Sequence, residues 1–165
     1  MDTIHFFDGI AYFKALAEKN KLAKANKFFP CTCSGINSLE EVLQNLQRQS
    51  AFIAIDDTND AAIEQRGGGW FKARTFTVFL MKRYKFGDMA DRQQQLDTCR
   101  QLFRQIHSKL IIDKETNDEL MYMDVSRIYS REFGQYFING CTGLYFMLTL
   151  HEPVDLRYNE SEWTK

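Results

Sequence analysis

Cysteine and histidine are the residue types in this chain that could bind a metal ion or act as nucleophile and base. Among 165 residues there are four cysteines and three histidines, and only Cys31 and Cys33 stand close together. A structural zinc site needs four ligands, usually two such pairs at a fixed spacing. Neither Cys99 nor Cys141 has a cysteine or histidine beside it, and the histidines are isolated in the sequence. We therefore predict no metal site.

Two polar stretches contain some, but not all, of the residues of known ligand-binding loops. Arg66 to Gly69 could cradle a phosphate, but phosphate loops precede a helix, whereas a predicted strand follows these glycines. The acidic stretch of Asp56, Asp57 and Asp60 lacks the glycine and glutamate of an EF-hand calcium loop. The sequence thus predicts no cofactor and no catalytic residue. An enzyme would need a site assembled across the fold from loop residues, for which the candidates are Cys141, His107, Asp56 and Asp57.

A long strand is the centre of the predicted fold. Residues 70–85 are rich in β-branched and aromatic types, which suit a pleated, half-buried surface. Phe76 and Val78 point to one face of this strand, and Phe79 and Met81 point to the other. Because both faces are apolar at its middle, the strand needs a cover on each side.

A long amphipathic helix follows this strand at once. Gly87 breaks the strand, and Asp88 can cap a helix that runs to about Ile112. Its apolar residues recur at spacings of three, four or seven, which places them on one face. They are Met89, Leu96, Cys99, Phe103, Ile106 and Leu110. We expect this helix to cover one face of a sheet.

The other elements are shorter. Helices are predicted over residues 3–25 and 38–49, the second begun by a capping box of Ser38 and Glu41. Strands are predicted over 51–55, 123–133 and 144–151, and connections over 28–35, 57–69, 113–119 and 134–143. The segment 57–69 is expected to be a mobile loop because three glycines end it. This order predicts an α+β domain with one mixed, mostly antiparallel sheet of about four strands, a long amphipathic helix on one face, and N-terminal helices.

Length and charge narrow the class of protein. The chain fits a single domain, with an N-terminal helix and connection (1–35), a core (36–152) and a C-terminal tail (153–165) that could dock through Tyr158 and Trp163. A net charge of −1 gives no reason to expect direct nucleic-acid binding or an anionic membrane partner. No apolar run approaches a membrane span, and no signal peptide opens the chain, so we expect a cytoplasmic protein with free thiols.

The order and texture of these elements resemble a known group of proteins. The apolar run AFIAIDD, the strand ARTFTVFLMKRY, the helix DRQQQLDTCRQLFRQIHSKL and the closing strand GLYFMLTL, within residues 36–152, resemble the tail terminator and tail-completion (minor tail) proteins of long-tailed phages. This resemblance implies an α+β fold with a helix on a mixed sheet, non-enzymatic assembly into rings, commonly hexamers, and a place at the end of the tail tube. The implied partners are copies of the same chain and other tail or head–tail connector proteins. The implied location is the cytoplasm of a bacterial host and then the virion.

Aromatic side chains are the candidate contacts for such an assembly. Aromatic residues make up 14% of the chain, and they signal either core or surface that is buried on association. The candidate subunit or partner contacts are Trp70, Phe71, Phe79, Met81, Tyr136 and Phe137. The alternative is a monomeric or dimeric adaptor that binds a ligand or a protein in a groove lined by some of these aromatics.

Overall fold

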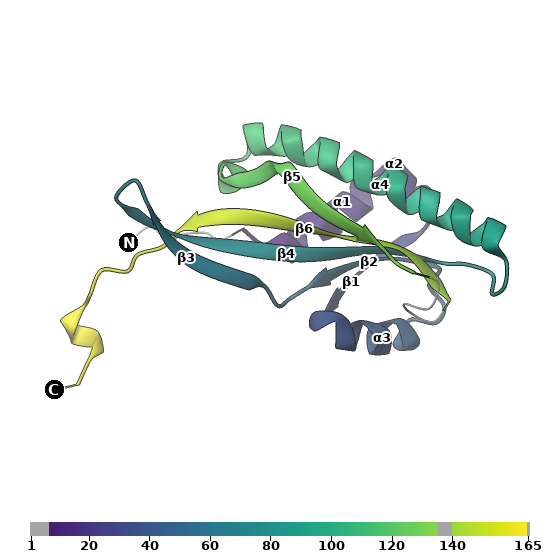
Figure 1. Cartoon of the computed structure of the whole chain (residues 1–165), viewed down its shortest axis with the longest axis horizontal. Helices are drawn as coiled ribbons and strands as arrows, with labels where there is room; N and C mark the ends of the chain where they lie inside the picture. The colour runs from purple at the N-terminus through teal and green to yellow at the C-terminus, as the bar shows by residue number, and fades with distance from the viewer. Residues whose placement is uncertain (1–6, 135–139, 165) are drawn as a thin grey trace.

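One six-stranded sheet organises the protein, shown in Figure 1 as a computed structural model that describes residues 7–134 and 140–164. The helices are α1 (Gly9–Lys19), α2 (Lys21–Ala25), α3 (Gly35–Asn45) and α4 (Met89–Thr116), with 3-10 turns η1 (Asp118–Leu120) and η2 (Glu160–Glu162). The strands are β1 (Phe28–Cys33), β2 (Ala51–Asp56), β3 (Asp60–Arg66), β4 (Gly69–Arg83), β5 (Met123–Glu132) and β6 (Cys141–Pro153). The predicted α+β class is confirmed.

The sheet is mixed and mostly antiparallel, as predicted. Its strands lie in the order β1-β2-β4-β6-β5, and only β1 and β2 run parallel. The 15 residues of β4 are long enough to pair with two strands along one edge. The second half of β4 pairs with β2, and the first half pairs with β3. The sheet therefore has six strands within the described residues, where about four were expected.

β1 is the first of the two strands that the sequence analysis missed. Residues 28–35 were expected to be an irregular connection, but Phe28–Cys33 pairs in parallel with β2 at the edge of the sheet. Pro30 has no N–H group to donate, which argues against a central strand and is tolerated on an edge strand. The proline therefore marks an edge strand here.

β3 is the second missed strand, and it lies in the segment expected to be a mobile loop. Gly67 (φ 55°) and Gly68 (φ 85°) form a two-residue turn between Arg66 and Gly69, which pair with each other. A tight hairpin turn of type I′ needs positive φ at both central residues, and glycine adopts it without steric cost. The glycines therefore fix the β3–β4 hairpin.

The N-terminal helical region is divided in two at Asn20. A single helix was expected over residues 3–25, of which residues 3–6 lie outside the described residues. Asn20 has an extended backbone (φ −75°, ψ 126°), ends α1, and accepts a hydrogen bond at its side chain from the Ala23 N–H of α2 (2.8 Å). An asparagine that caps the next helix competes with continuation of the first one.

α3 begins three residues before the predicted capping box. Gly35 (φ 71°) is its first residue, and Ser38 lies inside its first turns. The Ser38 hydroxyl accepts a hydrogen bond from the Ser34 N–H (2.6 Å). The serine therefore supports the helix start from within the helix.

α4 begins as predicted. The Asp88 side chain accepts a hydrogen bond from the Asp91 N–H (2.9 Å). Its buried residues are Leu96, Cys99, Leu102, Ile106 and Leu110. Met89 is exposed, Phe103 is half-buried, and the helix continues to Thr116, beyond the predicted loop start at residue 113.

Despite its 28 residues, α4 is too polar for a bilayer, and no other helix in the described parts of the chain has the length and apolar character to cross one.

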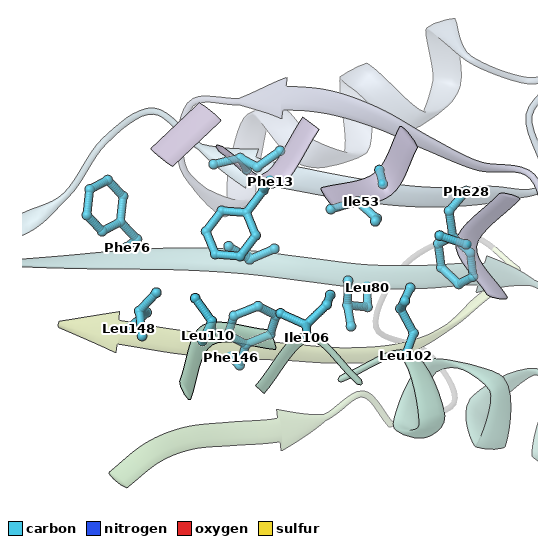
Figure 2. Close-up of a cluster of buried hydrophobic side chains, with 14 of the residues drawn as sticks. Phe13, Phe28, Ile53, Phe76, Leu80, Leu102, Ile106, Leu110, Phe146 and Leu148 are labelled. Carbon is cyan, nitrogen blue, oxygen red and sulfur yellow. The ribbon is translucent and has the colours of Figure 1, made fainter. Parts of the chain in front are cut away.

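The main core lies between one face of the sheet and α1, α2 and α4. Figure 2 shows Phe13 of α1 and Ile106 of α4 meeting Leu80 and Phe146 of the sheet. The rings of Phe13 and Phe146 are 5.8 Å apart in an edge-on arrangement that aromatic pairs favour. This face is therefore covered by helices from two separate parts of the sequence, the N-terminal region and the middle of the chain.

We predict that Gly143 is required for β4 and β6 to pair. Its φ is 148°, and a Cβ atom at this position would lie 1.9 Å from the Leu80 carbonyl oxygen. The substitution Gly143→Ala should lower the free energy of unfolding by about 2–4 kcal/mol, because the backbone of β4 cannot move away without breaking the ladder.

Gly134→Ala is the matched control, since nothing lies within 4 Å of a Cβ atom there. Denaturant unfolding of the two variants should show a lower midpoint for Gly143→Ala alone. Equal midpoints would contradict the predicted close approach.

Candidate assembly surface

The residues proposed for a loop-assembled enzyme site are not brought together by the fold. His107 lies on α4, where its Nε2 atom is 2.9 Å from the Val125 carbonyl oxygen, on the main-core side of the sheet. Cys141 is buried on the opposite side, in the cluster beneath α3. The sheet therefore separates the histidine from the cysteine.

The two aspartates of that candidate site hold the start of α3. Asp56 Oδ1 accepts hydrogen bonds from the Gly35 N–H and the Thr58 N–H, each at 2.9 Å. Asp57 Oδ1 accepts one from the Ser34 hydroxyl (2.6 Å). These carboxylates therefore join the end of β2 to α3. Within residues 7–134 and 140–164, no three His, Cys, Asp or Glu side chains are grouped so that they could hold a metal ion.

The four cysteines are free thiols with a reduced tendency to ionise. Burial raises the pKa of Cys31 to about 11 and the pKa of Cys99 to about 12. Burial also raises the pKa of Cys33 to about 12, helped by the nearby Asp56 carboxylate. The pKa of Cys141 is raised by burial as well. Because the thiolate is the reactive form, these cysteines are poor nucleophiles at neutral pH.

Two of the predicted contact residues belong to the interior of the isolated chain. Phe79 is 3% exposed and Met81 is 0% exposed, because Leu39 and Leu43 of α3 pack over them. The sequence predicts Phe79 and Met81 as subunit or partner contacts. These two positions are instead covered within the chain by α3, while α1 lies on the other face.

Trp70 and Phe71, two of the other predicted contacts, lie on the β3–β4 hairpin. Trp70, which is 42% exposed, and Phe71 are adjacent on β4, so they point to opposite faces of the hairpin. The Phe71 ring packs edge-on against Tyr122 at a centroid distance of 5.8 Å. Tyr136 and Phe137 lie outside the described residues. The hairpin pair therefore remains a candidate contact, with one ring for each face.

Half of one sheet face has no helix over it in the described chain. α3 packs on β2 and on the second half of β4, while the first half of β4, with β3 and β6 beside it, continues beyond the helix (Figure 1). Paired residues in a ladder present their side chains on the same face. The register therefore defines an open face made of Asp60, Ala62, Glu64 and Arg66 on β3, Phe71, Ala73, Thr75 and Thr77 on β4, and Met147, Thr149 and His151 on β6.

The centre of the open face consists of small, uncharged side chains. At its centre, the hydroxyl groups of Thr75 and Thr149 share a hydrogen bond of 3.0 Å across the β4–β6 ladder. At one end, the Glu64 carboxylate lies 3.2 Å from Nδ1 of His151 and 2.7 Å from the Arg66 guanidinium. Arg66 is thus paired with Glu64 at the edge of the open face, and the alanine and threonine positions at its centre carry no charge.

No protein-family model matches the chain, and no curated protein matches its sequence. The open face is thus interpreted from its own geometry.

Sequence reasoning overlooked the open face because it searched for apolar and aromatic residues. The signal that could have found it is the run of small residues at alternate positions of β4, namely Ala73, Thr75 and Thr77. Such positions alternate with Phe76 and Val78, which enter the main core.

The C-terminal tail does not dock on the body of its own chain. Val154 donates its N–H to the Trp70 carbonyl oxygen (2.9 Å), and every residue from 155 to 164 is exposed. Tyr158 and Trp163 were expected to pack on the body, but their rings stack on each other at 6.3 Å and stay 75% and 67% exposed. We call residues 155–164 the C-terminal arm.

The thiol environment gives a testable pH dependence. An unfolded cysteine titrates near pH ~8.5, whereas burial raises the pKa of Cys33 and Cys99 to about 12. Stability from these buried thiols is therefore complete below pH ~8.5 and is lost as the pH rises toward 12. We expect slow reaction of the native protein with a disulfide reagent at pH 8, and rapid reaction of all four thiols in denaturant.

Cys31→Ser is the informative variant, because Cys31 is half-buried and the other thiols are buried. It should remove the fastest of the slow native reactions. Rapid native labelling of Cys33 or Cys99 would contradict the burial described above.

Proposed function

We propose that this protein is a non-enzymatic virion assembly protein of a phage or prophage, a ring-forming tail terminator or head–tail joining component. The open face is the observation that carries this proposal. Its small, uncharged centre leaves the backbone of β4 and β6 accessible to a flat surface of another subunit. The α+β architecture, with a long helix packed on a mixed sheet, agrees with the fold implied by the sequence resemblance.

Tyrosine side chains at the border of the open face support contact with another protein at this surface. Tyr122 and Tyr129 are about half-exposed on the β5 side, and Tyr129 lies 6.3 Å from the Tyr145 ring. Tyrosine is enriched at protein interfaces because its ring is apolar and its hydroxyl still finds a partner. An antiparallel sheet can also leave a polar face in water, usually with long charged side chains on it. The centre of the open face has alanine and threonine instead.

The implied setting follows from the same proposal. Copies of the chain would associate in the cytoplasm of a bacterial host and then become part of the virion. Their partners would be a tail-tube or head–tail connector protein at either side of the ring. Tail-tube, tape-measure and head genes beside this gene would support the proposal, and metabolic neighbours would argue against it.

A charge placed on the open face should prevent assembly without unfolding the protein. We predict that Thr75→Lys abolishes the assembled species, because a lysine at the centre of a dry contact must lose its hydration. The measurement is mass by light scattering and native mass spectrometry over a range of concentrations. The wild-type protein should give one whole-number multiple of 19.4 kDa, and the variant should give the single chain.

Gln94→Lys is the matched control, since Gln94 is exposed on α4. It should assemble like the wild type and keep the wild-type melting temperature, while Thr75→Lys should stay folded and lose only the stability of the Thr75–Thr149 hydrogen bond, about 1 kcal/mol. Because such proteins can require the tail tube as a template, the same comparison is made with purified tail tubes added. A wild-type protein that stays a single chain in both settings would overturn the proposal.

A further inference from the structure

A groove lies between α1 and α4 on the main-core side of the sheet. Two hydrogen bonds bridge these helices: the Tyr12 hydroxyl donates to Asp113 (2.7 Å), and the Asn20 amide donates to Gln105 (2.9 Å). Tyr12 precedes Asn20 on α1 while Asp113 follows Gln105 on α4, so the helices run antiparallel. Between and beyond these bridges the helices leave a hollow of about 800 Å³.

The groove combines an apolar interior with a basic rim. Ile53 of β2, together with Leu102 and Ile106 of α4, forms its floor, and Leu16, Leu22 and Ile112 line its sides. Ile112 is 53% exposed, which is unusual for an isoleucine on a helix that already covers a sheet. Four cations also line the groove, namely Lys19, Lys21, Arg104 and Lys109. Lys109 is paired with Asp113 on the same helix.

The C-terminal arm has the opposite character. Its apolar residues are Leu156, which is 47% exposed, and the stacked pair of Tyr158 and Trp163, which is more exposed still. Two carboxylates, Glu160 and Glu162, belong to the η2 turn between the two stacked rings in sequence. A stacked aromatic pair held in water has a large apolar area to bury.

We propose that the C-terminal arm of one copy binds in the α1–α4 groove of a neighbouring copy. Tyr158 and Trp163 fill the apolar interior, and Glu160 and Glu162 face the basic rim at Lys19, Lys21 and Arg104. The match of an acidic, aromatic segment to a basic, apolar groove selects this occupant. The inference rests on the proposed function in taking a second copy of this chain as the partner.

The geometry of the arm favours a neighbouring copy over its own groove. The arm leaves the body beside Trp70, at the hairpin end of β4, and Figure 1 shows it running away from α4. Its ten residues span at most about 35 Å when extended. The arm is therefore a projecting element that can bridge two molecules.

The contact joins two different surfaces, so each copy offers both an arm and a groove. Head-to-tail contacts of this kind generate a closed ring where the rotation closes and a filament where it does not. The arm would add a second link to the contact made by the open face. In this second link, the surface used on the next subunit is the α1–α4 groove.

Photo-crosslinking of the full-length chain tests the contact directly. A photoreactive phenylalanine at position 163 is activated in an equal mixture of isotopically light and heavy protein, and the crosslinked peptides are sequenced. We expect mixed light–heavy crosslinks from position 163 to residues 16–22 or 102–112. Crosslinks confined to one isotope would show the arm in its own groove, and crosslinks to other segments or none at all would likewise overturn the proposal.

A charge exchange tests the role of the rim. Lys19→Glu with Arg104→Glu, or Glu160→Lys with Glu162→Lys, should each weaken self-association by about tenfold or more, and the four changes together should restore it. Arg48→Glu is the control, because Arg48 is exposed after α3, on the other side of the sheet. Equal association of all variants would overturn the proposal. Residues 155–164 are all exposed, so the arm variants should stay folded with a melting temperature close to that of the wild type.

These results separate the arm contact from the proposed function. Rings that form equally well after deletion of residues 155–164 would leave the assembly role standing and remove the arm contact. Mixed crosslinks at the groove in a protein that stops at the dimer would keep the arm contact and remove the ring.

Discussion

The need to cover both faces of one sheet governs this structure. The helices α1, α2 and α4 cover one face along its length, and α3 covers only the part of the other face around Phe79 and Met81. β4 makes this imbalance unavoidable, because its 15 residues reach from the core beneath α3 into the β3–β4 hairpin. The uncovered part is lined by alanine and threonine, which are small enough to expose without a large apolar cost. The chain thus buries Phe79 and Met81 beneath its own α3 and leaves a flat surface beside them.

This arrangement places the thiols and the two aspartates of the candidate enzyme site in structural roles and leaves other side chains at the surface. Side chains that could have been nucleophiles or bases are used inside the fold: the thiols are buried with raised pKa values, and Asp56 and Asp57 hold the start of α3. What remains at the surface is suited to contact between proteins. It comprises the open face, the aromatic residues at its border, the basic groove and the acidic arm. The proposed assembly role would use shape and surface in this way.

The parts of the fold that depend on local sequence could be predicted from it. The alternation along β4 and the cap at Asp88 are encoded by neighbouring residues, and both were found. β1 and β3 were not predicted because edge strands depend on their partners, and because proline and glycine are also typical of irregular chain. The covering of Phe79 by α3 depends on which helix crosses which face, and hydrophobic pattern alone does not specify that. The open face was missed because small side chains give no apolar signal.

Footprinting with hydroxyl radicals is the most direct test of the central claim that the open face becomes an interface. Met147 belongs to the open face and Met89 is exposed at the start of α4, so the two methionines form an internal pair for comparison. Their oxidation to sulfoxide is measured in dilute protein and in the assembled species. The account predicts that assembly protects Met147 and leaves Met89 unchanged. Assembly with unchanged oxidation of Met147 would contradict it.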